Sequence, residues 1–433
     1  MSTATAPPAV DAPPDDRPPL AKDRSFRGLL VTQLLGAFND NVFKQAVLLV
    51  AVAFAADAGL AGGPQSLATA VFSLPFLLSC ITGVLSDKVS KRSIVVACKG
   101  LEVVVMLAAT AVFFTTPPDS RTQFAALLAV LGLMAFQSTI FGPAKYGVLP
   151  ELFRDSDLPR ANGWMQGSTF LAIILGTALA GLLKETLGPS VWLLGLFCVA
   201  VAAAGTATSL WVRSTPPADP AAKLTAASVW PDARTRGAVL GEPRLRLALL
   251  VYSTFWMLGS TLIAAVNAFG TRQMGYGEFA TSLLAAGMGL GIGGGCVAAA
   301  RMSEGRVDFG LVRLGAAGVA FAGAAAAVLP LLLPAGRVSY VASVLALIGV
   351  GIFSGLLAVP LQTYIQAAPP AGVKGRAVGL MNALNAVGMV LGAGLYWACS
   401  AAFGAGKTSL TFAVVGAVIA PAAVMFRGGE DEA

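Results

Sequence analysis

Twelve long apolar stretches divide this chain, and they constrain its fold more than any motif does. Of its 433 residues, 56% are hydrophobic and only 12% are charged; an ordinary soluble domain has about 25% charged residues. A helix needs about 20 mostly apolar residues to cross a bilayer. The stretches cover approximately residues 27–56, 65–86, 94–115, 121–147, 161–186, 189–211, 244–270, 278–300, 309–333, 337–366, 376–400 and 405–425. The sequence therefore predicts an all-α polytopic membrane protein with twelve transmembrane helices.

The second half of the chain repeats the first. The run from Arg160 to Gln166 (RANGWMQ) returns as the run from Arg376 to Asn382 (RAVGLMN), and each copy opens a long apolar stretch. Pro143 of the first half corresponds to Pro360 of the second at nearly the same offset. Such a duplication in an apolar chain indicates a transporter built from two like-oriented, pseudo-symmetric halves of six helices each.

Polar segments mark the boundaries of these halves. Residues 213–243 interrupt the hydrophobicity and form the expected linker between a first half at 27–212 and a second half at 244–426. Residues 1–26 contain three Pro-Pro pairs that exclude the apolar helix of a signal peptide, so we expect a disordered cytoplasmic tail there. Residues 427–433 form a short cytoplasmic tail at the other end.

Basic residues set the predicted orientation, because loops rich in Lys and Arg stay in the cytoplasm. One side of the predicted topology collects most of them, including those of the linker. The other side keeps only Arg121, Lys184, Arg272, Arg337 and Lys407. Both termini and the linker are therefore predicted to be cytoplasmic. The net charge of +7 is a signal of topology and of contact with anionic membrane lipid, and it requires no nucleic-acid partner.

The chain lacks the residues of several kinds of site. It contains no histidine and no phosphate-binding loop of the type GxxxxGK[ST], which argues against an enzyme, ATP hydrolysis and most transition-metal sites. Its five cysteines lie in or beside apolar stretches without the spacing of metal ligands, and we assign them to packing. We expect no cofactor and no metal. Proton coupling, if it occurs, must use Asp or Glu.

Ionisable residues within membrane spans are costly and mark candidate functional sites. The first span carries Asp40, Asn41 and Lys44. Asp40 and Lys44 are four residues apart and so share one helix face, where Asn41 can hydrogen-bond to either. Two interpretations remain open: a self-neutralising pair, or a place on the substrate pathway.

The fourth span ends in a segment with two prolines and two glycines that contains Lys145. These residues loosen the helix end and free backbone groups. Lys145 is either an anchor that reaches back to the cytoplasmic interface or a cation that faces the cavity and receives an anionic group. Lys99 and Glu102, three residues apart near the predicted start of the third span, are interpreted as a structural pair at the interface.

The loop between the second and third spans, Gly83 to Arg92 (GVLSDKVSKR), resembles the signature loop of the major facilitator superfamily, with Ser90 where a glycine is usual. The resemblance implies the major facilitator fold. It also implies that Asp87 holds the halves together in one state by capping a helix start of the opposite half and pairing with a basic residue. A helix N-terminus favours a carboxylate, and the segment that begins at Lys374 offers both a helix start and a cation. The predicted conformational latch consists of Gly83, Asp87, Lys88, Lys91, Arg92 and Arg376.

The second half has few charges in its spans. Met257 corresponds to Asp40, and Gln362 corresponds to Lys145. The remaining polar residues of these spans are mostly expected to form hydrogen bonds between helices; Gln362 is the one included in the candidate site. A cavity between such halves has one charged wall and one apolar wall, which complements an amphiphile better than a sugar.

Three further segments resemble the bacterial lysophospholipid transporter family: Gln33–Asn41, Pro143–Leu152 and Ala161–Thr169. The resemblance implies a protein of the bacterial cytoplasmic (inner) membrane that moves monoacyl lipids such as lysophosphatidylethanolamine to the inner leaflet for reacylation by a separate acyltransferase. It assigns Asp40 and Lys145 to the lipid headgroup. A zwitterionic headgroup needs a carboxylate for its ammonium and a cation, from Lys145 or Lys44, for its phosphate.

The leading hypothesis is therefore an alternating-access, monomeric lysophospholipid transporter with a substrate site at Asp40, Asn41, Lys44, Lys145 and Gln362. Two other hypotheses are kept. One is a proton-coupled exporter of drugs or small amphiphilic solutes in which Asp40 titrates. The other is a membrane scaffold or receptor without transport, against which the charges retained in the spans argue.

Overall fold

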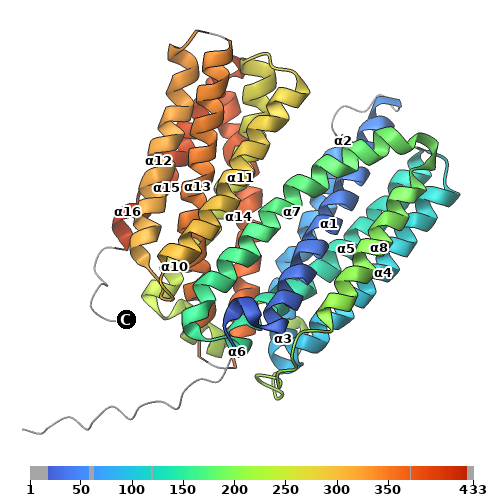
Figure 1. Cartoon of the computed structure of the whole chain (residues 1–433), viewed down its shortest axis with the longest axis vertical. Helices are drawn as coiled ribbons and strands as arrows, with labels where there is room; N and C mark the ends of the chain where they lie inside the picture. The colour runs from blue at the N-terminus through green and yellow to red at the C-terminus, as the bar shows by residue number, and fades with distance from the viewer. Residues whose placement is uncertain (1–17, 58–62, 119, 335, 371, 427–433) are drawn as a thin grey trace, which may run out of the picture.

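The computed structural model describes residues 18–57, 63–118, 120–334, 336–370 and 372–426, and in this part of the chain the regular structure is helical throughout. Two helical bundles stand side by side (Figure 1). The first contains α1 (Arg24–Asp57), α2 (Gly63–Ser73), α3 (Ser79–Lys88), α4 (Lys91–Thr115), α5 (Arg121–Gly147), α6 (Leu149–Leu152), α7 (Leu158–Leu187) and α8 (Trp192–Ser209). The second contains α10 (Pro243–Ala268), α11 (Glu278–Met302), α12 (Phe309–Leu332), α13 (Arg337–Ala367), α14 (Lys374–Phe403), α15 (Leu410–Ile419) and α16 (Ala422–Met425).

Short helical turns extend or join these helices. They are η1 (Leu20–Lys22), η2 (Leu74–Leu78), η3 (Asp155–Asp157), η4 (Gly188–Ser190), η7 (Phe269–Gln273) and η8 (Ala405–Lys407). The linker between the bundles contains η5 (Ala226–Val229), α9 (Ala233–Thr235) and η6 (Arg236–Leu240). Ten helices of the described chain are long and apolar enough to cross a membrane, and the span Leu67–Lys88 joins α2, η2 and α3.

The first and last predicted spans need separate description. α1 has 34 residues, which is ample to cross a bilayer, but it is outside the ten because its middle holds Asn39, Asp40, Asn41 and Lys44. The last span is the shorter apolar segment Leu410–Met425. With these two segments, the described helices correspond to the twelve predicted spans, in the two-bundle arrangement that the major facilitator resemblance leads us to expect.

The tail predicted to be disordered, residues 1–26, includes residues at its C-terminal end that are helical. Residues 1–17 and 427–433 lie outside the described residues, but α1 already begins at Arg24 and η1 precedes it. Leu20 and Phe26 are buried in the same apolar core as Leu29. The Pro-rich segment ends at Pro19, before these apolar side chains. They pack into the apolar core, and this packing keeps residues 20–26 ordered.

The two halves touch through the repeated sequence. Gly163 of the first copy lies on α7, where an added Cβ would stand 2.7 Å from the carbonyl oxygen of Cys296 on α11. Gly379 of the second copy lies on α14, where an added Cβ would stand even closer to the carbonyl oxygen of Ser79 on α3. Each copy therefore supplies the small residue that lets its helix approach the opposite half. The halves meet at one end and diverge toward the other (Figure 1).

The glycines that crowd α11 serve two different neighbours. Gly291 and Gly295 face α13, where an added Cβ would overlap with the carbonyl oxygens of Ile348 and Ile352. Gly289 faces Ile174 of α7 in the other half, whereas a Cβ at Gly294 would meet nothing within 4 Å. The crowding therefore allows close packing on both sides of one helix.

This packing gives a matched pair of substitutions on one helix. Gly295→Ala forces α11 away from α13, and overpacking of this kind costs about 1–3 kcal/mol. Gly294→Ala adds the same methyl group in open space and gains helix propensity of up to about 1 kcal/mol. We expect the apparent Tm in detergent, measured by intrinsic fluorescence, to fall for Gly295→Ala and to stay level or rise for Gly294→Ala. Equal shifts for the two variants would contradict the close contact.

Candidate functional site

The charged residues of α1 have separate partners. Asp40 accepts a hydrogen bond from the hydroxyl of Ser138 on α5, 2.8 Å from its Oδ2. Lys44 donates to Oδ1 of Asn41 at 2.9 Å, and its ammonium lies 5.0 Å from the centre of the Phe72 ring. Asp40 and Lys44 therefore have separate hydrogen-bond partners, and among the described contacts no direct ion pair joins them. Both side chains are partly exposed.

Lys145 points inward from α5. Its ammonium donates to Oε1 of Gln33 on α1 at 2.9 Å, and Gln33 in turn donates to Thr169 of α7 at 2.8 Å. The ammonium also lies 5.2 Å and 4.9 Å from the ring centres of Phe141 and Tyr146. These contacts direct the ammonium into the first half, which is not the direction expected of an anchor that reaches back to the cytoplasmic interface. Within the described chain its hydrogen-bond partner is a neutral amide, so the positive charge remains available to an anion.

Gln33 is a residue of this group that the sequence analysis did not select. It precedes Asp40 by seven residues, which is two helical turns, so both lie on one face of α1. That periodicity is a signal present in the sequence. Ser138, by contrast, is a small hydroxyl residue in an apolar helix, and its contact with Asp40 depends on how α5 packs against α1.

A second ion pair lies behind these residues. Lys99 and Glu102 on α4 are 2.5 Å apart and only 2% and 1% exposed. Asn39 donates to the other oxygen of Glu102 at 2.9 Å, and Gly36 leaves the space that the Lys99 ammonium fills. The pair is therefore buried, and the predicted interfacial position is wrong. The reason is that α4 begins at Lys91, which places Lys99 more than two turns inside the helix.

The ring of Phe141 lies beside two cations. The ammonium of Lys99 is 4.8 Å from its centre, and that of Lys145 is 5.2 Å away. An aromatic face attracts a cation through its quadrupole, so Phe141 helps to hold both lysines. This ring links the buried pair to the partly exposed residues of the site.

Gln362 belongs to a closed contact between the halves. The hydroxyl of Tyr252 on α10 accepts from Gln166 of α7 at 2.8 Å and donates to Gln362 of α13 at 3.1 Å. Tyr146, next to Lys145, donates to the same Gln166 at 3.1 Å. Gln362 is fully buried. This conformation therefore places it in the layer that closes the space between the halves rather than beside the exposed charges of α1.

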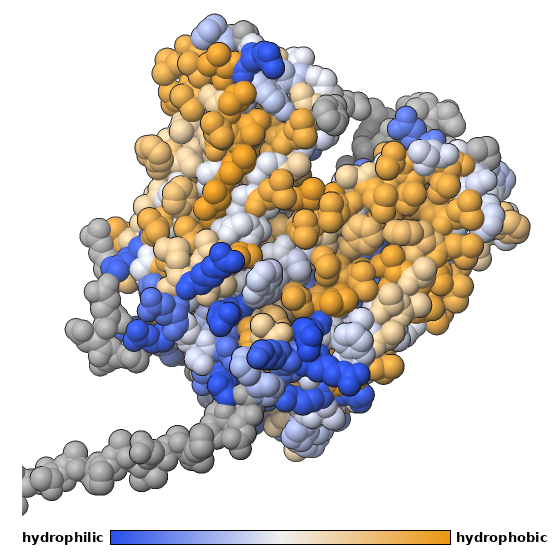
Figure 2. Space-filling model, in the orientation of Figure 1, coloured by the Kyte–Doolittle hydropathy of each residue, from blue (hydrophilic) through white to orange (hydrophobic). Residues whose placement is uncertain are grey.

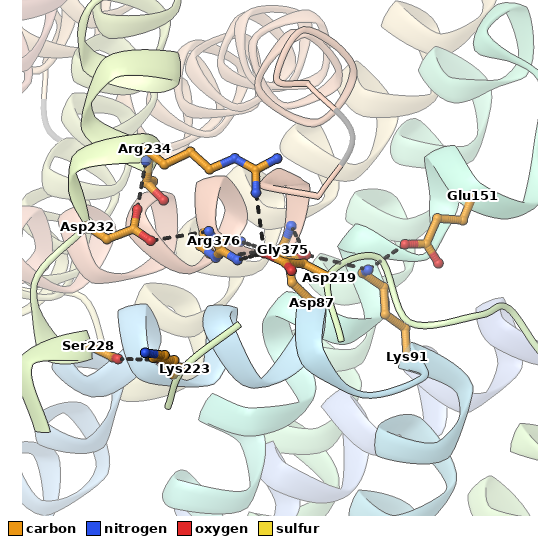
Figure 3. A network of polar contacts seen from close by, with 11 residues as sticks. Asp87, Lys91, Glu151, Asp219, Lys223, Ser228, Asp232, Arg234, Gly375 and Arg376 are labelled. Atoms are coloured by element: carbon orange, nitrogen blue, oxygen red, sulfur yellow. Dashed lines mark hydrogen bonds and ion pairs between the residues drawn. The ribbon is translucent and has the colours of Figure 1, made fainter. Parts of the chain in front are cut away.

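Asp87 joins the halves at the end where they meet, as Figure 3 shows. It is fully buried and accepts from the backbone N–H groups of Gly375 at 2.8 Å and Arg376 at 3.1 Å. These groups open α14, so the carboxylate caps a helix of the opposite half. Gly83, one turn earlier on α3, leaves room for the backbone of Gly375 to approach.

Two cations accompany Asp87. Lys91 is 3.7 Å from Asp87 and also forms an ion pair with Glu151. Arg376 brings its Nε to 3.6 Å from Asp87. Gly147, where a Cβ would stand 2.9 Å from Cε of Lys91, makes room for that buried side chain. We call Asp87, Lys91, Glu151, Gly375 and Arg376 the latch.

Two residues of the predicted latch lie outside it. The side chain of Lys88 is exposed. Arg92 donates from Nε to the carbonyl oxygen of Val212 at 2.7 Å, at the end of the first half. The break after Lys88 and the start of α4 at Lys91 turn these side chains away from α14. The motif predicted a cluster of cations around Asp87. Among the described contacts, Lys91 is the one cation of this loop that lies near Asp87.

Charged residues cover the end where the halves meet, and apolar side chains cover much of the two bundles above it (Figure 2). We call this charged end the basic face. By the distribution of Lys and Arg it is the predicted cytoplasmic side. The structure is therefore closed at the basic face, and its halves separate toward the opposite side.

Comparisons with known proteins agree with this architecture. The family model described as Major Facilitator Superfamily matches residues 29–393. A protein named lysophospholipid transporter LplT from Serratia proteamaculans is 26% identical over 402 residues, covering 88% of this chain and 90% of the relative. LplT of Yersinia pestis is 28% identical over 395 residues, covering 88% and 87%. The family resemblance predicted from the sequence is thus confirmed.

Solved structures agree at the level of the fold. The human organic anion transporter MFSD10 superposes with a TM-score of 0.72 at 16% identity, covering 94% of this chain and 100% of that one. A bacterial homologue of the iron transporter ferroportin, in an outward-facing state, gives a TM-score of 0.64 at 16% identity and covers 92% and 98%.

The buried ion pair behind the site predicts a non-additive effect on stability. Lys99→Met leaves the Glu102 carboxylate buried without its cation, which costs about 3–5 kcal/mol. Adding Glu102→Gln removes that charge and keeps an oxygen for Asn39, so we expect much of the lost stability to return. Thermal unfolding of both variants in detergent checks this. A double variant no more stable than Lys99→Met alone would contradict the coupling.

Proposed function

The chain belongs to the Major Facilitator Superfamily and is a membrane transporter rather than an enzyme, and we propose that it carries lysophospholipids. It is a multi-pass protein of the bacterial inner membrane. The proposed substrate has a zwitterionic headgroup and a single acyl chain, as in lysophosphatidylethanolamine. The relatives named LplT, which match most of the chain, support this class of substrate.

The observation that carries the proposal is the environment of Lys145. Its ammonium is directed into the protein by a neutral amide and two aromatic rings. Aromatic faces and an amide hold a cation in place without neutralising it, which leaves the charge for the phosphate of a headgroup. Lys44, partly exposed on α1, is a second cation available to the same group.

Asp40 supplies the opposite charge. Its Oδ2 accepts from Ser138, whereas its buried Oδ1 has no hydrogen-bond partner among the described residues. A carboxylate with a free acceptor suits the ammonium of an ethanolamine headgroup. Asn41, which bonds to Lys44, is proposed to hold that lysine beside the headgroup.

The second half provides an apolar wall for the acyl chain. Met257 on α10, which corresponds to Asp40 in the repeat, is a partly buried apolar side chain packed against the core of its half. A charged wall opposite an apolar wall matches an amphiphile. Gln362, closed off in this conformation, is proposed to meet the substrate after the halves move apart at the basic face.

The proposed cycle is alternating access with the latch as its cytoplasmic gate. In the proposed cycle, the conformation in which Asp87 caps α14 is the outward-open state. Substrate enters from the outer leaflet, the latch opens, and the lipid leaves toward the inner leaflet for reacylation by a separate acyltransferase. In this scheme both termini are cytoplasmic and one copy of the chain is sufficient.

Removal of the Lys145 charge tests the headgroup assignment. Lys145→Ala should reduce the uptake of labelled lysophosphatidylethanolamine into proteoliposomes by roughly tenfold or more, since one charged hydrogen bond contributes about 1.5–3 kcal/mol. Lys407→Ala, at an exposed lysine of η8, is the matched control and should transport normally. Normal uptake by Lys145→Ala, with folding checked by gel filtration, would refute the assignment.

The Oδ1 of Asp40, which has no hydrogen-bond partner among the described residues, also favours a second candidate function, a proton-coupled exporter of drugs or small amphiphilic solutes. An oxygen without a donor can bind a proton without breaking an existing bond. In that case Asp40 is the titrating group, and transport follows the pH gradient. A lipid transporter, by contrast, can run down the gradient of its own substrate.

Imposed gradients separate the two functions. Under the leading proposal, lysolipid uptake by the unmodified protein is similar with and without a pH gradient, and Asp40→Asn weakens the recognition of ethanolamine headgroups more than that of headgroups without an ammonium. Under the alternative, transport needs the gradient and Asp40→Asn abolishes the dependence. Proteoliposomes loaded at two internal pH values, with lysolipids of different headgroups outside, measure both effects.

A further inference from the structure

The linker between the halves is bound to the latch. The backbone N–H of Asp219 donates to the carbonyl oxygen of Asp87 at 2.8 Å, and η5 packs against α3. Figure 3 shows linker side chains, among them Asp219 and Asp232, directed toward Arg376. These contacts fix the linker against the first half at the basic face, so the linker is more than a flexible connection between the halves.

Arg376 takes its strongest ionic contacts from the linker. Its Nη2 is 2.5 Å from Asp219, and its Nη1 is 3.2 Å from Asp232. Its Nε, by comparison, is 3.6 Å from Asp87. The Asp87 carboxylate is already engaged by two backbone N–H groups of α14. Asp87 therefore binds the start of the helix, and the linker carboxylates bind the guanidinium.

These contacts matter because the guanidinium is buried. The side chain of Arg376 is only 6% exposed, and a charge removed from water needs ionic or hydrogen-bonded partners. Charge-assisted hydrogen bonds to carboxylates are about twice as strong as neutral ones. The closed arrangement of the basic face consequently depends on the linker as well as on Asp87.

The two linker carboxylates are attached to different halves. Asp219 follows Arg213, which binds the first half through Asp23 at 2.9 Å and the carbonyl oxygen of Leu152 at 3.1 Å. The linker is therefore attached to the first half twice, once through Arg213 and once through the N–H of Asp219 on Asp87. Because Arg376 belongs to α14 of the second half, the Asp219–Arg376 ion pair connects the halves.

Asp232 is placed to orient Arg376 from the side of the second half. It caps α9 by accepting from the N–H of Thr235 at 2.7 Å, and the following η6 packs on α10. Burial opposes ionisation of Asp232, but the hydrogen bonds from Thr235 and the charges of Arg376 and Arg234 hold its pKa below the usual value. Asp232 therefore remains a carboxylate at neutral pH. Its ion pair with Arg376 joins the part of the linker that packs on α10 to α14, and so connects elements on the side of the second half.

We infer that Asp219 is a second inter-half carboxylate of the latch, through which the linker stabilises the conformation closed at the basic face, while Asp232 positions the arginine. When the halves separate there, Arg376 leaves with α14. Asp219 cannot follow without breaking its bond to Asp87. The linker thereby sets the fraction of molecules that are open at this face. The inference rests on the proposed alternating-access cycle, but its test needs no substrate.

Spin labels across the basic face measure the closed and open populations. Ser156→Cys lies in the first half, and its backbone is next to Gly305 of the second. Arg306→Cys, at the exposed residue that follows Gly305, supplies the other label. The five native cysteines are buried, so the label reacts mainly with the two introduced ones. Dipolar broadening of the continuous-wave spectrum reports the short distance when the face is closed, and double electron-electron resonance reports the longer distance when it is open.

Asp219→Asn should raise the ratio of open to closed molecules by roughly tenfold or more, the equivalent of one lost charged hydrogen bond. Asp219→Glu, which keeps the charge, should stay mostly closed. Asp232→Asn should have a smaller effect than Asp219→Asn, because it removes a contact within one half. Asp155→Asn, at an exposed carboxylate of η3, is the matched control and should leave the ratio unchanged.

A second variant covers the case in which Asp219→Asn leaves Arg376 too poorly compensated to fold. Asp219→Asn combined with Arg376→Gln removes both charges of the pair, and it should also favour the open state relative to the unmodified chain. A closed population that is unchanged in these Asp219 variants, but reduced by Asp87→Asn, would overturn the role of the linker. That result would leave the latch and the proposed function intact, whereas failed lysolipid uptake with normal label distances would challenge only the substrate.

Discussion

Asp87 carries the contact on which the arrangement of the two halves depends. It is fully buried, and it accepts from two backbone N–H groups at the start of α14 in the opposite half. A buried carboxylate is costly unless its oxygens are satisfied, and here the helix start, Lys91 and Arg376 satisfy them. The helix start and Arg376 belong to the opposite half, so Asp87 has these partners only while the basic face is closed, whereas Lys91 lies in the same half as Asp87. The capping of α14 by Asp87 therefore stabilises the closed state and is lost when the basic face opens.

Charge is divided unequally between the halves. The first half holds the buried Lys99–Glu102 pair as well as the partly exposed Asp40, Lys44 and Lys145. Between the buried pair and Lys145 stands the ring of Phe141. In the second half, the position that corresponds to Asp40 is the apolar, partly buried Met257. In the proposed function, the first half recognises the polar headgroup and the second half accepts the acyl chain.

Much of this was predictable from particular residues. The span lengths and the repeat predicted the fold, and the repeated glycine has a clear reason, because Gly163 and Gly379 both stand where helices of opposite halves touch. The loop motif predicted that Asp87 would cap a helix of the other half. It also suggested Lys88 and Arg92, which the helix ends turn away from α14. A motif gives the residue types, but the direction of each side chain follows from where a helix begins.

The sequence by itself determined the membrane class, the two-half organisation and the short list of ionisable residues within the spans, because hydrophobic length and charge are properties of composition and spacing. Only the tertiary structure decided how deeply these residues are buried and which distant side chains they contact. It placed Lys99 and Glu102 in the interior, closed Gln362 between the halves and brought the linker carboxylate Asp219 to Arg376, 157 residues away in the chain. Contacts over such separations depend on how helices pack, and no local pattern of residues encodes them.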